Sequence, residues 1–202
     1  RDTFLFKMYQ AFGHHFDFIA IPIIKKRLRT DTSKVIIDES RPNLTEHLAS
    51  RFKEKIGQNV NLLGEVVLGN GEADHRYHHY LEAVESPDIN YISVKISGIY
   101  AQTHALNYRE SFPELVRRMS ALYQKAIDNP YVDEDGLKRA KIINLDMEEY
   151  KDAHFTMRLF KEVLSKPEFK NYSAGIVVQA YLPDAYDFQT ELLEFAKARV
   201  ES

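Results

Sequence analysis

Four short apolar runs, each followed by a stretch with helical periodicity, constrain the fold of this chain more than any other feature of its sequence. The runs cover residues 60–67 (VNLLGEVV), 89–97 (INYISVKIS), 141–147 (KIINLDM) and 174–181 (AGIVVQAY). Because helical segments rather than hairpin turns separate them, the strands are expected to be joined by right-handed crossovers and to lie parallel. The sequence therefore predicts an α/β fold with a parallel sheet.

The segments around these strands carry apolar residues at the spacing of one helix face. Helices are predicted over residues 1–29, 43–56, 72–85, 111–128, 152–164 and 186–200. Residues 98–108 are predicted as a loop and 132–139 as a charged connection, while 34–38 fit either a short strand or an extended lead-in. The expected organisation is a helical lead-in over 1–58, followed by four strand–helix units over 59–202.

Composition excludes several classes of protein. A net charge of −3 gives no reason to expect a nucleic-acid partner, and the absence of cysteine rules out disulfides and thiolate chemistry. The apolar run at 16–24 is too short to span a bilayer, and a basic segment, 25–29, follows it. This helix either packs on the next domain or lies at a membrane surface. We expect a cytoplasmic protein, with peripheral contact at the inner face of the membrane as the alternative.

Each predicted strand carries one polar residue close to its carboxyl end. These residues are Glu65, Lys95, Asp146 and Gln179. In parallel sheets the carboxyl ends of the strands form one rim, where binding and catalytic sites are built. We therefore expect the four side chains to meet at one rim.

Lys95 is the most constrained of these residues, because Ile and Val flank it within its strand. A lysine in such a strand must find an anion or lose its charge. Glu65 and Asp146 are the candidate partners. The pair could be purely structural, or Lys95 could hold a substrate carboxylate or the edge of a cofactor. Asp146 could equally cap the segment after its strand, and Gln179 could satisfy backbone groups.

A group of histidines on the helix predicted over 72–85 is a candidate metal site. His75, His78 and His79 fall at the spacing at which helical side chains meet. A solvated polar face opposite the buried aromatic stripe of the helix explains the same residues, and short patterns of this kind arise easily by chance. The solvated face is the preferred interpretation.

Four segments carry a resemblance to a known family. VNLLGEVVLG, YISVKISGIY, INLDMEEYKD and AGIVVQAYLPD, in this order, resemble the first half of the proline dehydrogenase domain, above all in the bacterial enzyme that also contains 1-pyrroline-5-carboxylate dehydrogenase. The resemblance implies a distorted (β/α)8 TIM barrel, represented here by leading helices and about four βα units. It also implies non-covalent FAD, oxidation of L-proline to 1-pyrroline-5-carboxylate, and a quinone as electron acceptor.

The resemblance assigns roles to five positions. Lys95 matches the lysine beside the flavin and the substrate, and Asp146 matches the active-site aspartate. Met147 and Gln179 match positions that touch FAD. Glu65 resembles the glutamate that pairs with a substrate-binding arginine.

The chain also departs from the family pattern. The later strands and the late helix that supply flavin-binding and proline-binding arginines have no counterpart here, and four strands cannot close an eight-stranded barrel. We expect a piece of a longer protein, catalytically incomplete alone, that pairs with the rest of its parent chain or with a second copy. Two other interpretations stay open: a metal-dependent barrel enzyme using Glu65, Asp146, Glu148 and Glu149, and a non-enzymatic interaction module.

Overall fold

The computed structural model describes residues 17–33, 35–38, 41–63, 69–101, 108–147 and 149–201. The chain divides into two compact units, Arg1–Ser50 and Arg51–Ser202. In the first unit, helix α2 (Asp17–Thr32) confirms the predicted N-terminal helix from residue 17 onward and extends it by three residues, whereas residues 1–16 lie outside the described part. Helix α3 (Arg41–Lys53) follows, and residues 35–38 form no strand. No helix in the described part of the chain is long and apolar enough to cross a membrane.

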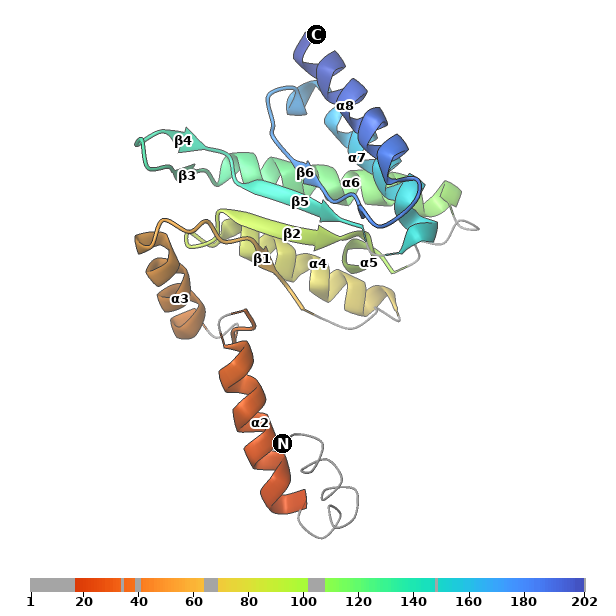
Figure 1. The fold of residues 1–202 in the computed structure, drawn as a ribbon. Coiled ribbons are helices and arrows are strands. Elements are labelled where there is room, and N and C mark those ends of the chain that lie inside the picture. The colour runs from red at the N-terminus through yellow and green to blue at the C-terminus, as the bar shows by residue number, and fades with distance from the viewer. Residues whose placement is uncertain are drawn as a thin grey trace. The chain divides into compact units, whose positions relative to one another are not determined.

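The second unit is built on a parallel sheet. Its described strands follow the order β1 (Val60–Asn61), β2 (Tyr91–Lys95), β5 (Ile142–Asp146) and β6 (Gly175–Ile176) (Figure 1). Every neighbouring pair is parallel, as predicted from the helical spacing. The two edge strands are shorter than predicted. Residues 62–63 and 178–181 continue outside the strands, while the backbone N–H of Val177 still donates to the Leu145 carbonyl at 3.0 Å. Residues 64–68, which include Glu65, lie outside the described residues.

Helices follow each strand and cover one face of the sheet. Helices α4 (Asn70–Glu85) and α6 (Tyr108–Asp128) run behind the sheet in Figure 1, and α7 (Ala153–Leu164) and α8 (Ala185–Glu201) complete the layer. Side chains alternate between the faces of a strand, so Val94 and Leu145 point to the same side. Both are fully buried, and each such burial contributes roughly 1.5–3 kcal/mol.

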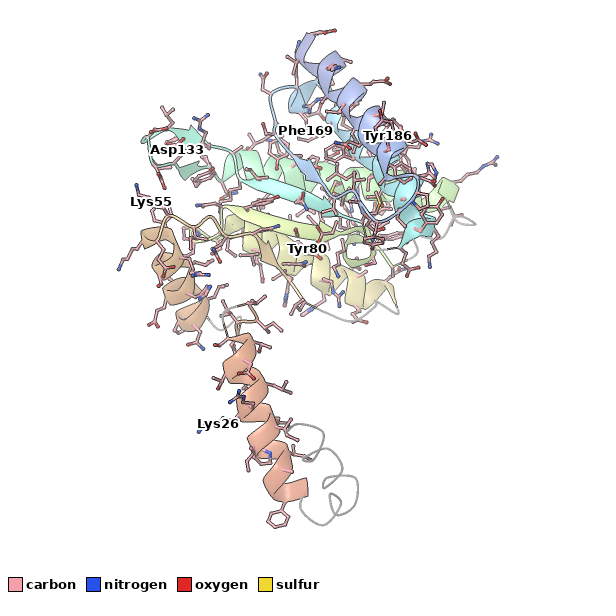
Figure 2. The ribbon with its side chains drawn as sticks, in the orientation of Figure 1. Lys26, Lys55, Tyr80, Asp133, Phe169 and Tyr186 are labelled. Carbon is pink, nitrogen blue, oxygen red and sulfur yellow. The ribbon has the colours of Figure 1, made fainter. Side chains whose placement is uncertain are left out.

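A short helix, α5 (Ile96–Ile99), replaces the end of the second predicted strand and the start of the predicted loop. The prediction was wrong here because close packing stops the strand at Lys95. A Cβ on Gly98 would lie 2.8 Å from the Tyr80 hydroxyl oxygen and 2.9 Å from Arg76 Cδ. Figure 2 shows Tyr80, which is fully buried, where α4 passes behind the sheet. The absence of a side chain at residue 98 lets the chain turn onto α4.

A second correction concerns residues 132–139, which form most of a small hairpin. Strands β3 (Tyr131–Val132) and β4 (Lys138–Arg139) pair antiparallel. Asp133 organises the turn: its Oδ1 accepts the backbone N–H groups of Asp135 (3.0 Å) and Leu137 (2.8 Å), and its Oδ2 accepts Arg139 Nε (2.8 Å). Gly136 takes a φ of 77°, which a glycine adopts without strain.

Arg118 on α6 joins the helices of this layer. Its guanidinium contacts Asp74 on α4 and Glu114 one turn earlier, each at 2.6 Å, and donates to the Ile99 carbonyl on α5 at 3.0 Å. Arg117 also hydrogen-bonds to Glu114. The hydrogen bond from Arg117 and, after it, that from Arg118 lower the pKa of Glu114 to about 2.

Two other cations satisfy backbone carbonyls at the ends of helical turns. Lys141 is buried, and its Nζ donates to the carbonyls of Val84 and Ser86 at the end of α4. Arg199 Nη2, on α8, donates to three carbonyls that follow or end the 3-10 turn η4 (Pro167–Phe169), those of Phe169, Lys170 and Tyr172. Such groups have no partner within their own helix, so a cation there removes a desolvation cost.

Candidate active site

Lys95 and Asp146 lie side by side at the carboxyl rim of the sheet. Each is the last residue of its strand, and the two are register partners across β2 and β5. Both residues are half-buried. A cation and a carboxylate thus end adjacent parallel strands at the edge where barrel proteins build their sites.

An open hollow of about 620 Å³ lies above these two residues. Its lining includes three further side chains with polar groups, those of Asn61, Gln179 and Tyr181, and an apolar wall of Val177 and Val178. Met147 and Ala180 complete the lining. Of the four residues predicted at the rim, Lys95, Asp146 and Gln179 therefore share one hollow. Glu65 and Glu148 lie outside the described residues.

Two asparagines donate hydrogen bonds to the Asp146 carboxylate. Asn144 Nδ2 donates to Oδ1 at 2.9 Å, and Asn61 Nδ2 donates to Oδ2 at 3.2 Å. An ionised carboxylate only accepts hydrogen bonds, so both amides must turn their NH2 groups toward it. Each oxygen of Asp146 is thereby fixed by one neutral donor.

These asparagines belong to a polar row that runs across the sheet. Asn61, Ser93 and Asn144 are register neighbours on β1, β2 and β5. Ser93 Oγ accepts from Asn59 Nδ2 at 2.9 Å and from Asn144 Nδ2 at 3.4 Å. This row was not predicted from the sequence. Its signal was present, because Ser93 and Asn144 stand two positions before Lys95 and Asp146, on the same face of their strands.

Met147 and Gln179 are linked to each other. Gln179 Nε2 donates to the Met147 carbonyl at 3.2 Å, which ties the segment after β6 to the segment after β5. The Met147 side chain packs in an apolar cluster with Ala153 and Met157 of α7 and Phe188 of α8. Met147 therefore meets the hollow while its side chain supports the helices.

A second link joins the same two segments. The Tyr150 hydroxyl, in the turn η3 (Tyr150–Asp152), donates to the Asp184 carboxylate just before α8. This hydrogen bond raises the pKa of Tyr150, because only the protonated phenol can donate it to the Asp184 carboxylate. The segment after β6 is thus fastened to the segment after β5 at two points.

The histidines of α4 do not line the hollow and make local contacts. The rings of His75 and His79 have centroids 4.3 Å apart, and His78 Nδ1 lies 2.6 Å from the Asp74 carbonyl oxygen. Within the described ranges, no group of three or more His, Cys, Asp or Glu residues is arranged to hold a metal ion.

The fold and this rim define an α/β protein of the barrel type, with its candidate site at the carboxyl ends of the strands. Residues 44–201 match the family model of proline dehydrogenase, and the chain belongs to the proline dehydrogenase family. This confirms the resemblance found in the four sequence segments and the (β/α)8 fold class that it implied.

Solved structures agree with this assignment. Proline Utilization A (PutA) from Corynebacterium freiburgense is 36% identical, with a TM-score of 0.76 over 96% of this chain. PutA from Bdellovibrio bacteriovorus, inactivated by N-propargylglycine, is 29% identical, with a TM-score of 0.72 over 88%. A PutA variant from Bradyrhizobium japonicum, at 22% identity and a TM-score of 0.59 over 70% of this chain, shows the fold alone.

The chain spans 19%, 20% and 15% of the length of these three PutA chains, respectively. No curated protein sequence matches it significantly.

Proposed function

We propose that the protein to which these residues belong is an FAD-dependent proline dehydrogenase. It oxidises L-proline to 1-pyrroline-5-carboxylate and passes the electrons to a quinone. The observation that carries the proposal is the register pair of Lys95 and Asp146 above an open hollow, in a chain of the proline dehydrogenase family.

The residues around the hollow fit a flavin. The Lys95 ammonium and the Gln179 amide supply polar groups at its edge, while Val177 and Val178 supply an apolar wall for a flat ring. FAD, when bound, supplies the hydride acceptor for the oxidation. Lys95 and Gln179 would hold the cofactor, with Met147 beneath them.

Lys95 and Asp146 have different roles because their charges are opposite. L-Proline carries a carboxylate and an ammonium group at neutral pH. Lys95 attracts the substrate carboxylate or offsets negative charge on the cofactor. Asp146 repels the substrate carboxylate and negative charge on the cofactor, and instead orients cationic groups. Glu65, which the resemblance pairs with a substrate-binding arginine, would have the same orienting role. The two asparagines fix the carboxylate of Asp146, and so fix what it orients.

The extent of the sheet bears on activity. The parallel sheet has four strands in the described part of the chain, and residues 59–202 are proposed as the first four βα units of an eight-unit barrel. A closed barrel excludes water from the reacting atoms, which an open sheet does not. We propose that these 202 residues alone are catalytically incomplete.

An absorption spectrum tests the proposal. The purified chain and a longer protein that includes the complete barrel are each mixed with FAD, freed of excess cofactor and scanned before and after L-proline is added; L-alanine serves as the control. We expect the longer protein to retain a flavin band that L-proline bleaches and a quinone restores. We expect the 202-residue chain to show no bleaching.

Two results would contradict parts of this proposal. A longer protein that retains no flavin and oxidises no proline overturns the assigned function. Bleaching in the 202-residue chain would contradict the proposal that it is catalytically incomplete, and would show that the four-stranded parallel sheet, alone or in association, assembles a working site.

A further inference from the structure

Asn144 ends the polar row on β5, and its side chain contacts residues of two strands, β2 and β5. Its Nδ2 reaches Asp146 Oδ1 at 2.9 Å and Ser93 Oγ at 3.4 Å, and the residue is only 8% exposed. Asn61, the other amide on Asp146, lies on the exposed β1 edge. The buried amide is therefore the more rigid of the two supports.

Gly175 is the register partner of Asn144 on β6. A Cβ at this glycine would overlap Asn144 Oδ1 and lie 3.3 Å from Asn144 Cγ. The backbone of Gly175 does not take the left-handed conformation that favours glycine. Space for the Asn144 amide, rather than backbone freedom, explains the glycine.

We propose that Asn144 is a positioning residue of this site, which orients the Asp146 carboxylate, and that Gly175 sets the position of Asn144. The inference rests on the proposed function for its effect on catalysis. Its geometric part, the coupling of Gly175 to Asn144, does not depend on the reaction. A side chain at residue 175 pushes the amide away from β6, and the amide in turn displaces the carboxylate that it holds.

A mutant cycle tests the coupling. Asn144→Ala, Gly175→Ala and the double variant are made in the protein with the complete barrel. We expect each single variant to lower kcat/KM for L-proline by roughly 10- to 100-fold, since displacements of about 1 Å in a site have effects of this order. The double variant should be no worse than Asn144→Ala, because the clash disappears with the amide. Gly71→Ala is the matched control, since its Cβ would meet nothing within 4 Å.

Urea unfolding supplies a readout that needs neither FAD nor L-proline. Gly175→Ala should lower the unfolding midpoint in the Asn144 background and leave it unchanged in the Asn144→Ala background. Additive effects in both kinetics and unfolding overturn the proposal. If the reference protein oxidises no proline, the proposed function fails, while the unfolding cycle still decides whether Gly175 acts through Asn144.

Asn144→Asp separates positioning from packing, because it keeps the shape and removes the N–H donor. Lys95 of β2 and Asp146 of β5 are the charged groups in the described parts of the four strands, and the new carboxylate would sit against Asp146. We expect kcat/KM to fall at pH 8 and to recover toward pH 6, as a shared proton restores a donor between the two carboxylates. Asn144→Ala should show no such recovery. Activity of Asn144→Asp equal to the reference at pH 8 would contradict a positioning role.

Discussion

Lys95 and Asp146 are register partners at the ends of two adjacent parallel strands. The first strand continues directly into α5, and the second continues into the segment that Gln179 fastens. The backbone that follows each residue is therefore held in place. A cation and a carboxylate held at fixed positions can each interact with a group of opposite charge on a bound molecule.

Removal of the cation gives the first prediction. Lys95→Met in the protein with the complete barrel should lower kcat/KM for L-proline by about 100-fold, the order of effect seen when one charged or hydrogen-bonding group is removed from a site. The Met side chain keeps the bulk of the lysine, so the circular dichroism spectrum should not change. Lys138→Met, on the exposed hairpin strand β4, is the control. Unchanged proline turnover in Lys95→Met would show that this lysine has no part in the reaction.

The second prediction concerns Lys141, which caps α4. Lys141→Met should lower the free energy of unfolding by about 1–3 kcal/mol, because the buried carbonyl of Val84 loses this donor and that of Ser86 is left with the backbone N–H of Ile89. Urea denaturation followed by circular dichroism measures the change. Lys138→Met again supplies a matched exposed lysine, and a loss of equal size in that variant would mean that the capping contact is not the cause.

The third prediction is a pH dependence. The pKa of Glu114 is about 2 in the folded protein and 4.5 ordinarily, so its contribution is fully present above pH 4.5 and is lost as the pH falls toward 2. The carboxylate is partly solvated, and we expect a contribution of about 1 kcal/mol. The test compares unfolding free energies at pH 7 and pH 3 for the reference chain and Glu114→Gln. The difference between the two chains should shrink at pH 3; a constant difference would rule out the ionised Glu114 as its source.

The fourth prediction concerns the contact between α8 and the turn η4. Arg199→Met should cost about 1–2 kcal/mol of unfolding free energy, since the carbonyls of Phe169, Lys170 and Tyr172 lose a shared donor. Lys197→Met, two residues earlier on the exposed side of α8, should have little effect. Hydrogen exchange offers a second measurement: protection should fall around residues 167–172 and remain around 92–95.

The sequence predicted parallel strands and the meeting of Lys95, Asp146 and Gln179 at one rim, because those features depend on local patterns. The run around Lys95 is apolar on both sides, and helical periodicity between strands fixes parallel pairing. The lengths of β1 and β6 were not predictable in this way, because pairing depends on which neighbour lies alongside. Val177 and Val178 are apolar and β-forming, yet the strand pairing with β5 is confined to Gly175 and Ile176.

The polar row was missed for a related reason. Asn144 and Ser93 are ordinary strand residues until the register places them side by side, and the sequence does not state that register. The hairpin at residues 131–139 was missed although it has a readable signal, Asp135-Gly136 between two β-forming segments. The charged residues of this segment indicated an irregular connection instead.

That hairpin is a suitable site for attaching a label or an epitope. It precedes β5, so it joins the amino end of a strand whose carboxyl end carries Asp146, about 13 Å away along the strand at roughly 3.3 Å per residue. Asp133 holds the turn through contacts within the hairpin itself, and the tip is exposed (Figure 2). A fluorophore or epitope grafted at the tip would report on this protein from the side remote from its rim, and would leave the chemistry above Lys95 undisturbed.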